Sequence, residues 1–347
     1  MRPKTFFIAV LAGTMACLGV FILLLSMEDP FFVLHGLGEY DTAMFDNQRY
    51  QMAGLIRHQD YSQVVMGTSL VANFRSSWFT AETEKQTLKI TFPDGWISEF
   101  DTSLDLAYRT HSRLDRVYFC LDPNILIRPD SDRTVELPQY LYNQNPFDDV
   151  EYLINADTYQ TALRHWLRRR SAQTLPLDSA YIWDRDYTFD KETALGGYHR
   201  PELSGSVLPG DAYLAAAEEN LDVICAWAEK HPDTEFVIWF PPYSILYWDM
   251  MLREGRADAI LNAVEYAADR LMPYDNVAVH CFLHATSLTT DLDYYTDHIH
   301  CSAALTRWES RHLIAGKWRL TPENCHPRLE ELREFIKSYD YEALLAS

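Results

Sequence analysis

The sequence predicts an α/β domain with a mostly parallel sheet in three α/β/α layers, preceded by one transmembrane helix. Three observations support this prediction. A long uncharged segment opens the chain, short β-rich runs then alternate with amphipathic stretches of helical length, and most of these runs are almost continuously apolar. Strands that alternate with helices form parallel sheets, and strands that are apolar throughout lie between layers of helices.

The first expected element is a membrane anchor in residues 1–27. The 23 residues between Lys4 and Glu28 carry no charge, and at about 1.5 Å per residue they cover a hydrocarbon core of roughly 30 Å. Basic residues precede this segment and acidic residues follow it. We therefore expect residues 5–27 to cross the cell membrane once, with the N-terminus cytoplasmic and the C-terminal domain extracytoplasmic. A cleaved signal peptide is the alternative, although the apolar run exceeds a usual h-region and no A-x-A site follows.

The expected α/β domain occupies residues 59–347, after a connector over residues 28–58. Its predicted strands are residues 63–66, 87–92, 115–122, 235–240 and 276–282, and its predicted helices are residues 98–111, 211–230 and 256–271. The helices carry apolar residues at three- and four-residue spacing. The second strand alternates polar with apolar residues, which favours a half-exposed strand near the sheet edge.

An insertion over about residues 123–210 interrupts this alternation. It contains a predicted amphipathic helix over about residues 149–171, followed by a stretch rich in Trp, Tyr and Asp around residues 181–198. Ligands of open α/β sheets bind beyond the carboxyl ends of the strands, so an insertion after the third strand can cover that crevice. We expect a lid or substrate platform, with a purely structural excursion as the alternative.

The charge of the chain excludes nucleic acid as its main partner. Its 50 acidic and 30 basic side chains give a formal net charge of −20, and the basic residues form no stripe. Neutralising phosphates requires clustered cations. The hydrophobic share of 48% suits a folded chain with a sizeable core. Because the net charge is strongly negative, an anionic substrate would need a local binding site.

The cysteines leave the redox compartment open. Cys120, Cys225 and Cys281 lie in apolar runs, which favours buried inert thiols. Cys301 and Cys325 are candidates for a disulfide. Together with nearby histidines these two cysteines also suggest a metal site, but the ligand spacing is irregular, and we expect neither a metal nor a cofactor.

A serine follows the first predicted strand. Residues 67–69 read Gly-Thr-Ser, and residues 70–74 can begin a helix. Backbone N–H groups at a helix N-terminus stabilise a developing oxyanion, so Ser69 is a candidate nucleophile. The alternative is an ordinary turn with a serine at the N-cap.

A candidate base follows the last predicted strand. Asp297 and His300 stand three residues apart, which places the carboxylate on the same side as the imidazole. A surface ion pair or helix cap is the alternative, and His298 is a second candidate base. Parallel topology brings the ends of the first and last strands to one sheet edge, so we expect Ser69 to meet His300 there.

Taken together, the two motifs resemble the SGNH/GDSL hydrolase superfamily, in particular membrane-anchored SGNH-like proteins of bacterial cell envelopes. Residues 67–69 are similar to the family's Gly-Asp-Ser block, with threonine in place of aspartate, and Asp297-x-x-His300 is similar to its C-terminal block. The resemblance covers most of residues 45–305. It implies a flavodoxin-like fold and serine acyl transfer, in which His300 takes the proton of Ser69 and Asp297 orients the imidazole.

The resemblance also implies an oxyanion hole. The backbone N–H of Ser69 would supply one donor. Gly95 stands at the position of the family's second-block glycine, although Asp-Gly is also an ordinary turn. Asn124 matches the asparagine of the family's Gly-x-Asn block, with Asp122 in place of the glycine.

The expected function is an extracytoplasmic serine esterase or O-acyltransferase that forms an acyl-enzyme on Ser69. Its expected substrate is an acyl ester or an envelope glycan or related polymer, and hydrolysis and transfer share the same intermediate. A multi-pass acyl donor protein is a candidate partner, because similar proteins work with such donors. The alternative, which the departures at Thr68 and Asp122 favour, is a non-catalytic glycan-binding or scaffold protein of an envelope-modification system.

Overall fold

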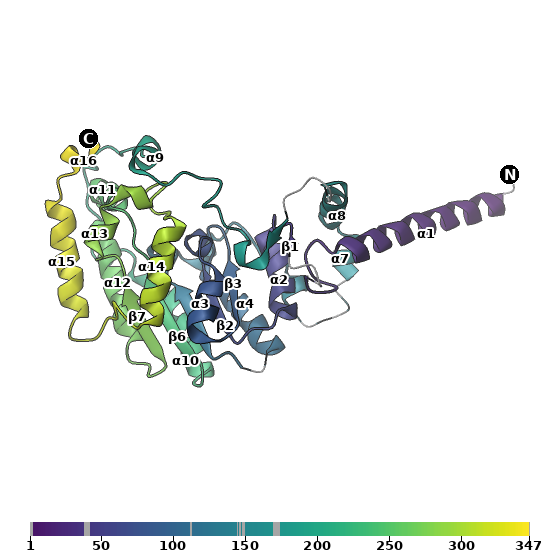
Figure 1. Ribbon diagram of the computed structural model, residues 1–347, viewed down its shortest axis with the longest axis horizontal. Helices are drawn as coiled ribbons and strands as arrows, with labels where there is room; N and C mark the ends of the chain where they lie inside the picture. Colours follow the sequence, from purple (N-terminus) through teal and green to yellow (C-terminus); the bar gives the residue numbers. More distant parts are fainter. Residues whose placement is uncertain are drawn as a thin grey trace. The chain divides into compact units, whose positions relative to one another are not determined.

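The computed structural model divides the chain into two compact units (Figure 1). It describes residues 3–37, 42–111, 113–143, 145, 147, 150–168 and 174–346. The anchor unit comprises residues 1–59 and 136–180, and the sheet unit comprises residues 60–135 and 181–347. The boundary near residue 59 lies where the α/β domain was expected to start. Residues 136–180 of the expected insertion, however, belong with the N-terminal helix.

The anchor unit contains one helix that is long and apolar enough to cross a membrane, α1 (Pro3–Glu28), and it is the single such helix in the described part of the chain. The unit's other elements are β1 (Thr42–Ala43), α2 (Gln48–His58), α6 (Gln139–Tyr142), α7 (Val150–Ile154), α8 (Ala156–Arg168), β5 (Leu175–Pro176) and η3 (Leu177–Ser179). Strands β1 and β5 pair antiparallel.

The single helix expected over residues 149–171 is divided into α7 and α8, and residues 149 and 169–171 lie outside the described residues. The division falls at Asn155. Its side-chain oxygen accepts a hydrogen bond from the backbone N–H of Asp157 at 2.8 Å, which is the N-cap role that asparagine favours. The amphipathic pattern continues across Asn155, so the sequence did not indicate that α8 begins there.

The sheet unit is built on a five-stranded parallel sheet. Its strands are β2 (Gln63–Gly67), β3 (Thr87–Thr91), β4 (Arg116–Cys120), β6 (Glu235–Phe240) and β7 (Val277–Cys281), in the order β3-β2-β4-β6-β7. These confirm the five predicted strands. The strand that begins the chain's β/α alternation, β2, lies between β3 and β4, and β3 forms one edge as expected.

Helices connect and cover these strands (Figure 1). The longer ones are α3 (Ser76–Thr83), α4 (Ile97–Thr110), α10 (Leu214–Lys230), α11 (Ile245–Arg253), α12 (Ala257–Leu271), α14 (Ala303–Ile314) and α15 (Cys325–Ser338). The short ones are η1 (Ser69–Val71), α5 (Pro123–Leu126), η2 (Asp130–Asp132), α9 (Lys191–Gly196), α13 (Thr286–Thr289), η4 (Leu292–Tyr294) and α16 (Tyr341–Leu345). Helix α10 contacts α4 and α12, while α3 contacts α14. The three predicted helices of the domain are confirmed as α4, α10 and α12.

The edge strand β3 is not half-exposed, which corrects the expectation from its alternating pattern. Lys89 is only 5% exposed and Thr91 is fully buried. The Lys89 ammonium donates hydrogen bonds to the carbonyls of Ala72 at 2.6 Å and Phe74 at 2.8 Å. A buried charge needs such partners, and here they lie in the segment that follows Ser69.

The cysteines of the described chain are all free thiols, so the candidate Cys301–Cys325 disulfide is not formed. Cys120, Cys225 and Cys281 are buried as expected. Cys301 instead contacts the carboxylate of Glu309, at 3.8 Å from sulfur to oxygen.

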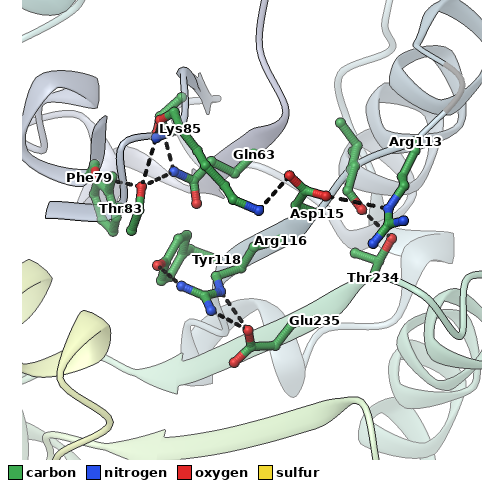
Figure 2. Close-up of polar contacts among 12 residues, drawn as sticks. Gln63, Phe79, Thr83, Lys85, Arg113, Asp115, Arg116, Tyr118, Thr234 and Glu235 are labelled. Atoms are coloured by element: carbon green, nitrogen blue, oxygen red, sulfur yellow. Dashed lines mark hydrogen bonds and ion pairs between the residues drawn. The ribbon is translucent and has the colours of Figure 1, made fainter. Parts of the chain in front are cut away.

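Charged side chains pair with one another at the amino-terminal edge of the sheet, as Figure 2 shows. Lys85 lies 2.6 Å from Asp115, just before β4. The Arg116 guanidinium at the start of β4 donates to Glu235 at the start of β6, at 2.7 Å from Nε to Oε2. The second pair joins the beginnings of the neighbouring strands β4 and β6, whereas the first joins the segments before β3 and β4, which lie on either side of β2. Both pairs balance their charges locally.

Candidate active site

Ser69 stands on a tight turn at the carboxyl end of β2. A side chain at Gly67 would place its Cβ 2.5 Å from Val71 and 2.7 Å from Cys120, so glycine is required there. The expected helix over residues 70–74 is only the single 3₁₀ turn η1. Backbone dipoles of a long helix therefore do not point at Ser69. The turn is held instead by Lys89, which donates to carbonyls just beyond it.

The structure brings Ser69, His300 and Asp297 together. The Ser69 hydroxyl lies 2.9 Å from Nε2 of His300. Nδ1 of His300 lies 2.6 Å from Oδ2 of Asp297. The other carboxylate oxygen of Asp297 accepts the backbone N–H groups of Ile299 at 2.8 Å and His300 at 2.7 Å. The carboxylate is thus oriented on both of its oxygens.

The surroundings of Asp297 favour its ionised form. Burial raises the pKa of this carboxyl group, but the hydrogen bonds and charge of His300, with the N–H of Ile299, outweigh burial and leave the pKa below its usual value. An ionised Asp297 accepts a hydrogen bond from the N–H at Nδ1, which leaves the Nε2 lone pair facing the Ser69 hydroxyl. This is the geometry of a serine nucleophile with a general base.

His298, the second candidate base, occupies a different place. Its ring lies parallel to that of Tyr247, with 6.4 Å between the ring centroids. Its backbone carbonyl accepts hydrogen bonds from both the N–H and the hydroxyl of Ser244. Burial lowers the pKa of His298. The structure therefore assigns the contact with Ser69 to His300.

Asn73 is a site residue that the sequence pattern did not reveal. It is buried, and its side-chain oxygen accepts the backbone N–H groups of Trp183 at 3.1 Å and Asp184 at 3.2 Å. Its amide nitrogen donates to the carbonyl of Cys301 at 3.0 Å. One side chain thus joins the turn after Ser69, the residue after His300 and the end of the insertion.

Trp183 forms a wall of the site. Its ring meets the His300 ring edge to face, with centroids 4.3 Å apart. Trp183 belongs to the aromatic stretch that was expected to serve as a lid or platform, and this part of the insertion lies in the sheet unit. The ring limits the space in which the imidazole can turn.

The two departures from the family motif, Thr68 and Asp122, contact one another. The Thr68 hydroxyl donates to Oδ2 of Asp122 at 3.1 Å. Tyr243 and the backbone N–H of Asn124 donate to Oδ1. Burial raises the pKa of Asp122, although these three hydrogen bonds favour its charged form. A fully buried carboxyl group therefore lies behind the Ser69 turn, held by neutral donors.

The two other oxyanion candidates have structural partners of their own. The Asn124 amide nitrogen donates to the Tyr243 hydroxyl at 3.0 Å, and its oxygen accepts from Tyr247 at 3.2 Å. The Gly95 carbonyl accepts from Arg128 at 2.9 Å, and a Cβ at Gly95 would meet the Phe100 ring at 2.7 Å. Among the described residues, no hydrogen bond joins either one to Ser69, so their oxyanion roles stay predictions.

No family model matches this chain, and a search of curated proteins finds no relative. The described residues contain no group of three or more His, Cys, Asp or Glu side chains that could hold a metal ion. What the site can do chemically follows from the contacts among Ser69, His300 and Asp297.

Proposed function

We propose that this protein is a serine acyl-transfer enzyme, an esterase or O-acyltransferase that forms its acyl-enzyme on Ser69. The observation that carries the proposal is the continuous chain of contacts from Ser69 through His300 to Asp297, 2.9 Å and 2.6 Å long at its two steps. These residues come from segments 231 positions apart in the sequence. If Asp297 and His300 formed only a surface ion pair or a helix cap, nothing would require Nε2 of His300 to lie against the Ser69 hydroxyl.

The reaction follows from the contacts. As the Ser69 oxygen attacks the ester carbonyl carbon, Nε2 of His300 takes the hydroxyl proton, and Asp297 stabilises the resulting imidazolium. The tetrahedral intermediate then expels the alcohol, which takes the proton from His300, and the acyl group stays on Ser69. Water or a sugar hydroxyl next gives its proton to His300 and attacks the acyl carbon. The second tetrahedral intermediate breaks its bond to the Ser69 oxygen, which takes the proton back from His300, and the acid or a new ester is released.

The fold supports a place in the SGNH/GDSL superfamily. The strand order β3-β2-β4-β6-β7 is that of a doubly wound sheet. The separate helix groups, α4 with α10 and α12, and α3 with α14, are consistent with three α/β/α layers. Thr68 and Asp122 would then be a coupled departure from the family motif, because the two side chains share a hydrogen bond.

The proposed substrate is an acylated glycan or related polymer outside the cell membrane. Helix α1 can anchor the chain, and the basic residues before it favour an external catalytic domain. Trp183 and Tyr187, whose rings meet at 5.3 Å beside His300, offer apolar surfaces of the kind that stack on sugar rings. A multi-pass acyl donor protein would be the partner of a transferase.

A fluorophosphonate probe and an activated acetyl ester test the proposal on the full-length, detergent-solubilised chain. We expect probe labelling and ester hydrolysis in the wild type, and loss of both in Ser69→Ala. Ser338→Ala is the matched control, because this exposed serine on α15 donates only to backbone carbonyls of its own helix. Equal labelling of the wild type and Ser69→Ala, or none in either, would favour the non-catalytic glycan-binding alternative.

A further inference from the structure

Helix α8 exposes three large apolar side chains and buries three polar ones. Leu163, Trp166 and Leu167 are 46%, 49% and 65% exposed, and their three- and four-residue spacing places them on one face. We call these three residues the α8 stripe. The face turned to the protein carries Thr158, Thr161, Ala162 and His165. A surface helix in water has the opposite arrangement.

Two side chains of α8, one buried and one exposed, contact Asp46 within the anchor unit. Nε2 of His165 lies 3.2 Å from the carboxylate of Asp46, and Arg164 reaches the same oxygen at 3.3 Å. These contacts determine which face of α8 turns inward. A rotation of α8 that buried the α8 stripe would break the contact between His165 and Asp46. The exposure of the stripe is therefore fixed by the packing of the opposite face.

Helix α8 also contacts the membrane-spanning helix. Elements α1 and α8 lie side by side within the anchor unit (Figure 1). The Phe21 and Tyr159 rings lie 5.1 Å apart between their centroids. Phe21 belongs to the uncharged span and precedes Glu28 by seven residues, which is about 10 Å along a helix axis. Part of α8 therefore lies level with the last turns of the apolar segment.

The residue types around the α8 stripe match a membrane interface. Tryptophan and tyrosine are enriched at the level of the lipid headgroups, and arginine can extend its guanidinium from an apolar surface toward phosphates. Arg164 and Arg168 are both exposed on the helix beside the stripe. Helix α7, which contacts α8, adds the exposed side chains of Val150 and Ile154.

We propose that α8 lies in the interface of the bilayer that α1 crosses, with the α8 stripe among the first acyl carbons. The chain would then hold the membrane by two elements, a spanning helix and an interfacial one. This proposal depends on α1 being a membrane helix and is independent of the chemistry at Ser69.

Tryptophan fluorescence of the full-length chain in nanodiscs tests the proposal directly. Trp166 is the only one of the nine tryptophans within residues 1–59 and 136–180. Nanodiscs of phosphatidylcholine and phosphatidylglycerol are prepared with and without lipid brominated at the acyl carbons nearest the headgroup. We expect the brominated lipid to quench about a tenth of the emission, since one tryptophan of nine is affected, and Trp166→Phe to remove that quenching.

Two controls make the result decisive. Trp78→Phe, in the sheet unit, should leave the quenched emission unchanged, and the double variant Leu163→Gln/Leu167→Gln should reduce it while Trp166 remains. Quenching that persists in Trp166→Phe, or is absent from the wild type, would overturn the proposal. If Trp166 is shielded from both lipid and aqueous acrylamide only in discs that hold two protomers, the stripe is covered by a second copy, which also overturns it.

Discussion

At the amino-terminal edge of the sheet, carboxylates bond to lysine and arginine, whereas near its carboxyl-terminal edge Asp297 bonds to histidine and Asp122 to hydroxyl and backbone N–H groups. Asp115 is the clearest contrast, because its hydrogen bond from Lys85 lowers its pKa (Figure 2). Asp122 is fully buried among neutral donors, and burial raises its pKa. The pKa of an aspartate is thus shifted downward at one edge of the sheet and upward at the other.

The two kinds of partner separate carboxylates that hold a fixed charge from a carboxylate whose partner can exchange a proton. Arginine and lysine stay charged at neutral pH, so a carboxylate paired with them has no proton to exchange. Histidine can accept a proton near neutral pH. The pair of Asp297 and His300 can therefore take the proton of Ser69, and the pair of Arg116 and Glu235 cannot.

The largest expected effect comes from removing the base. His300→Gln should lower ester hydrolysis by about 10³-fold or more, because the Ser69 hydroxyl then lacks a proton acceptor. His326→Gln is the matched control, since His326 also lies against a carboxylate, that of Glu265 at 2.7 Å, but is exposed and remote in the chain from the serine. Steady-state hydrolysis of an activated ester measures both. If both variants lost ester hydrolysis equally, the result would contradict a special role for His300 as the base of Ser69.

The second effect concerns the buried carboxyl group of Glu309, whose contacts are the Trp239 indole and the Cys301 thiol among the described residues. Burial raises the pKa of Glu309 from its usual 4.5 to about 8. An acid with a raised pKa stabilises the fold fully below pH 4.5, and this contribution is lost as pH rises through about 8. At 1.36 kcal/mol per pH unit, the loss is on the order of 5 kcal/mol.

Glu309→Gln should therefore flatten the dependence of stability on pH. The amide can still accept from the Trp239 indole, which donates to Glu309 at 3.0 Å. Chemical denaturation of the solubilised chain at pH 6 and pH 8.5 measures the free energy of unfolding. A variant whose stability falls with pH as steeply as that of the wild type would show that Glu309 is not the titrating group.

A smaller effect is expected from Thr68→Val, which removes one donor to the buried Asp122. An intramolecular hydrogen bond contributes about 0.5–3 kcal/mol, with the upper end for a charged partner, so the free energy of unfolding should fall by an amount in this range. The turn that carries Ser69 should also lose order, which lowers kcat more than it raises KM. Thr68→Ser keeps the hydroxyl and should restore both quantities. If serine does no better than valine, the hydrogen bond at 3.1 Å has no role.

The smallest effect belongs to the amino-terminal edge. Arg116→Gln removes an ion pair whose side chains are 30% and 47% exposed, and pairs of this kind contribute up to about 1 kcal/mol. We expect a small loss of stability that salt masks in the wild type, with ester hydrolysis unchanged. Thermal unfolding and kinetics at two salt concentrations measure it. A hundredfold loss of activity would mean that the two edges are coupled.

Much of the fold could be predicted because its signals are local. A run of 23 uncharged residues identifies α1, and short apolar runs between helical stretches identify the five strands. The meeting of Ser69 with His300 was also expected, since parallel strands deliver their carboxyl ends to one edge. In each case the evidence lies within one segment or follows from the direction of the strands.

Other features were decided only by tertiary contacts. The alternation in β3 predicted an exposed Lys89, yet its ammonium is buried because carbonyls beyond the Ser69 turn accept its protons. Nothing local connects Asn73 to Trp183, or Thr68 to Asp122, because each pair joins segments that are distant in the chain. The candidate residues Ser69, Asp297 and His300 and the apolar segment of α1 can be recognised from local patterns in the chain. The hydrogen bonds and the burial of individual side chains depend on neighbours that are distant in the sequence, so they follow only from the folded chain.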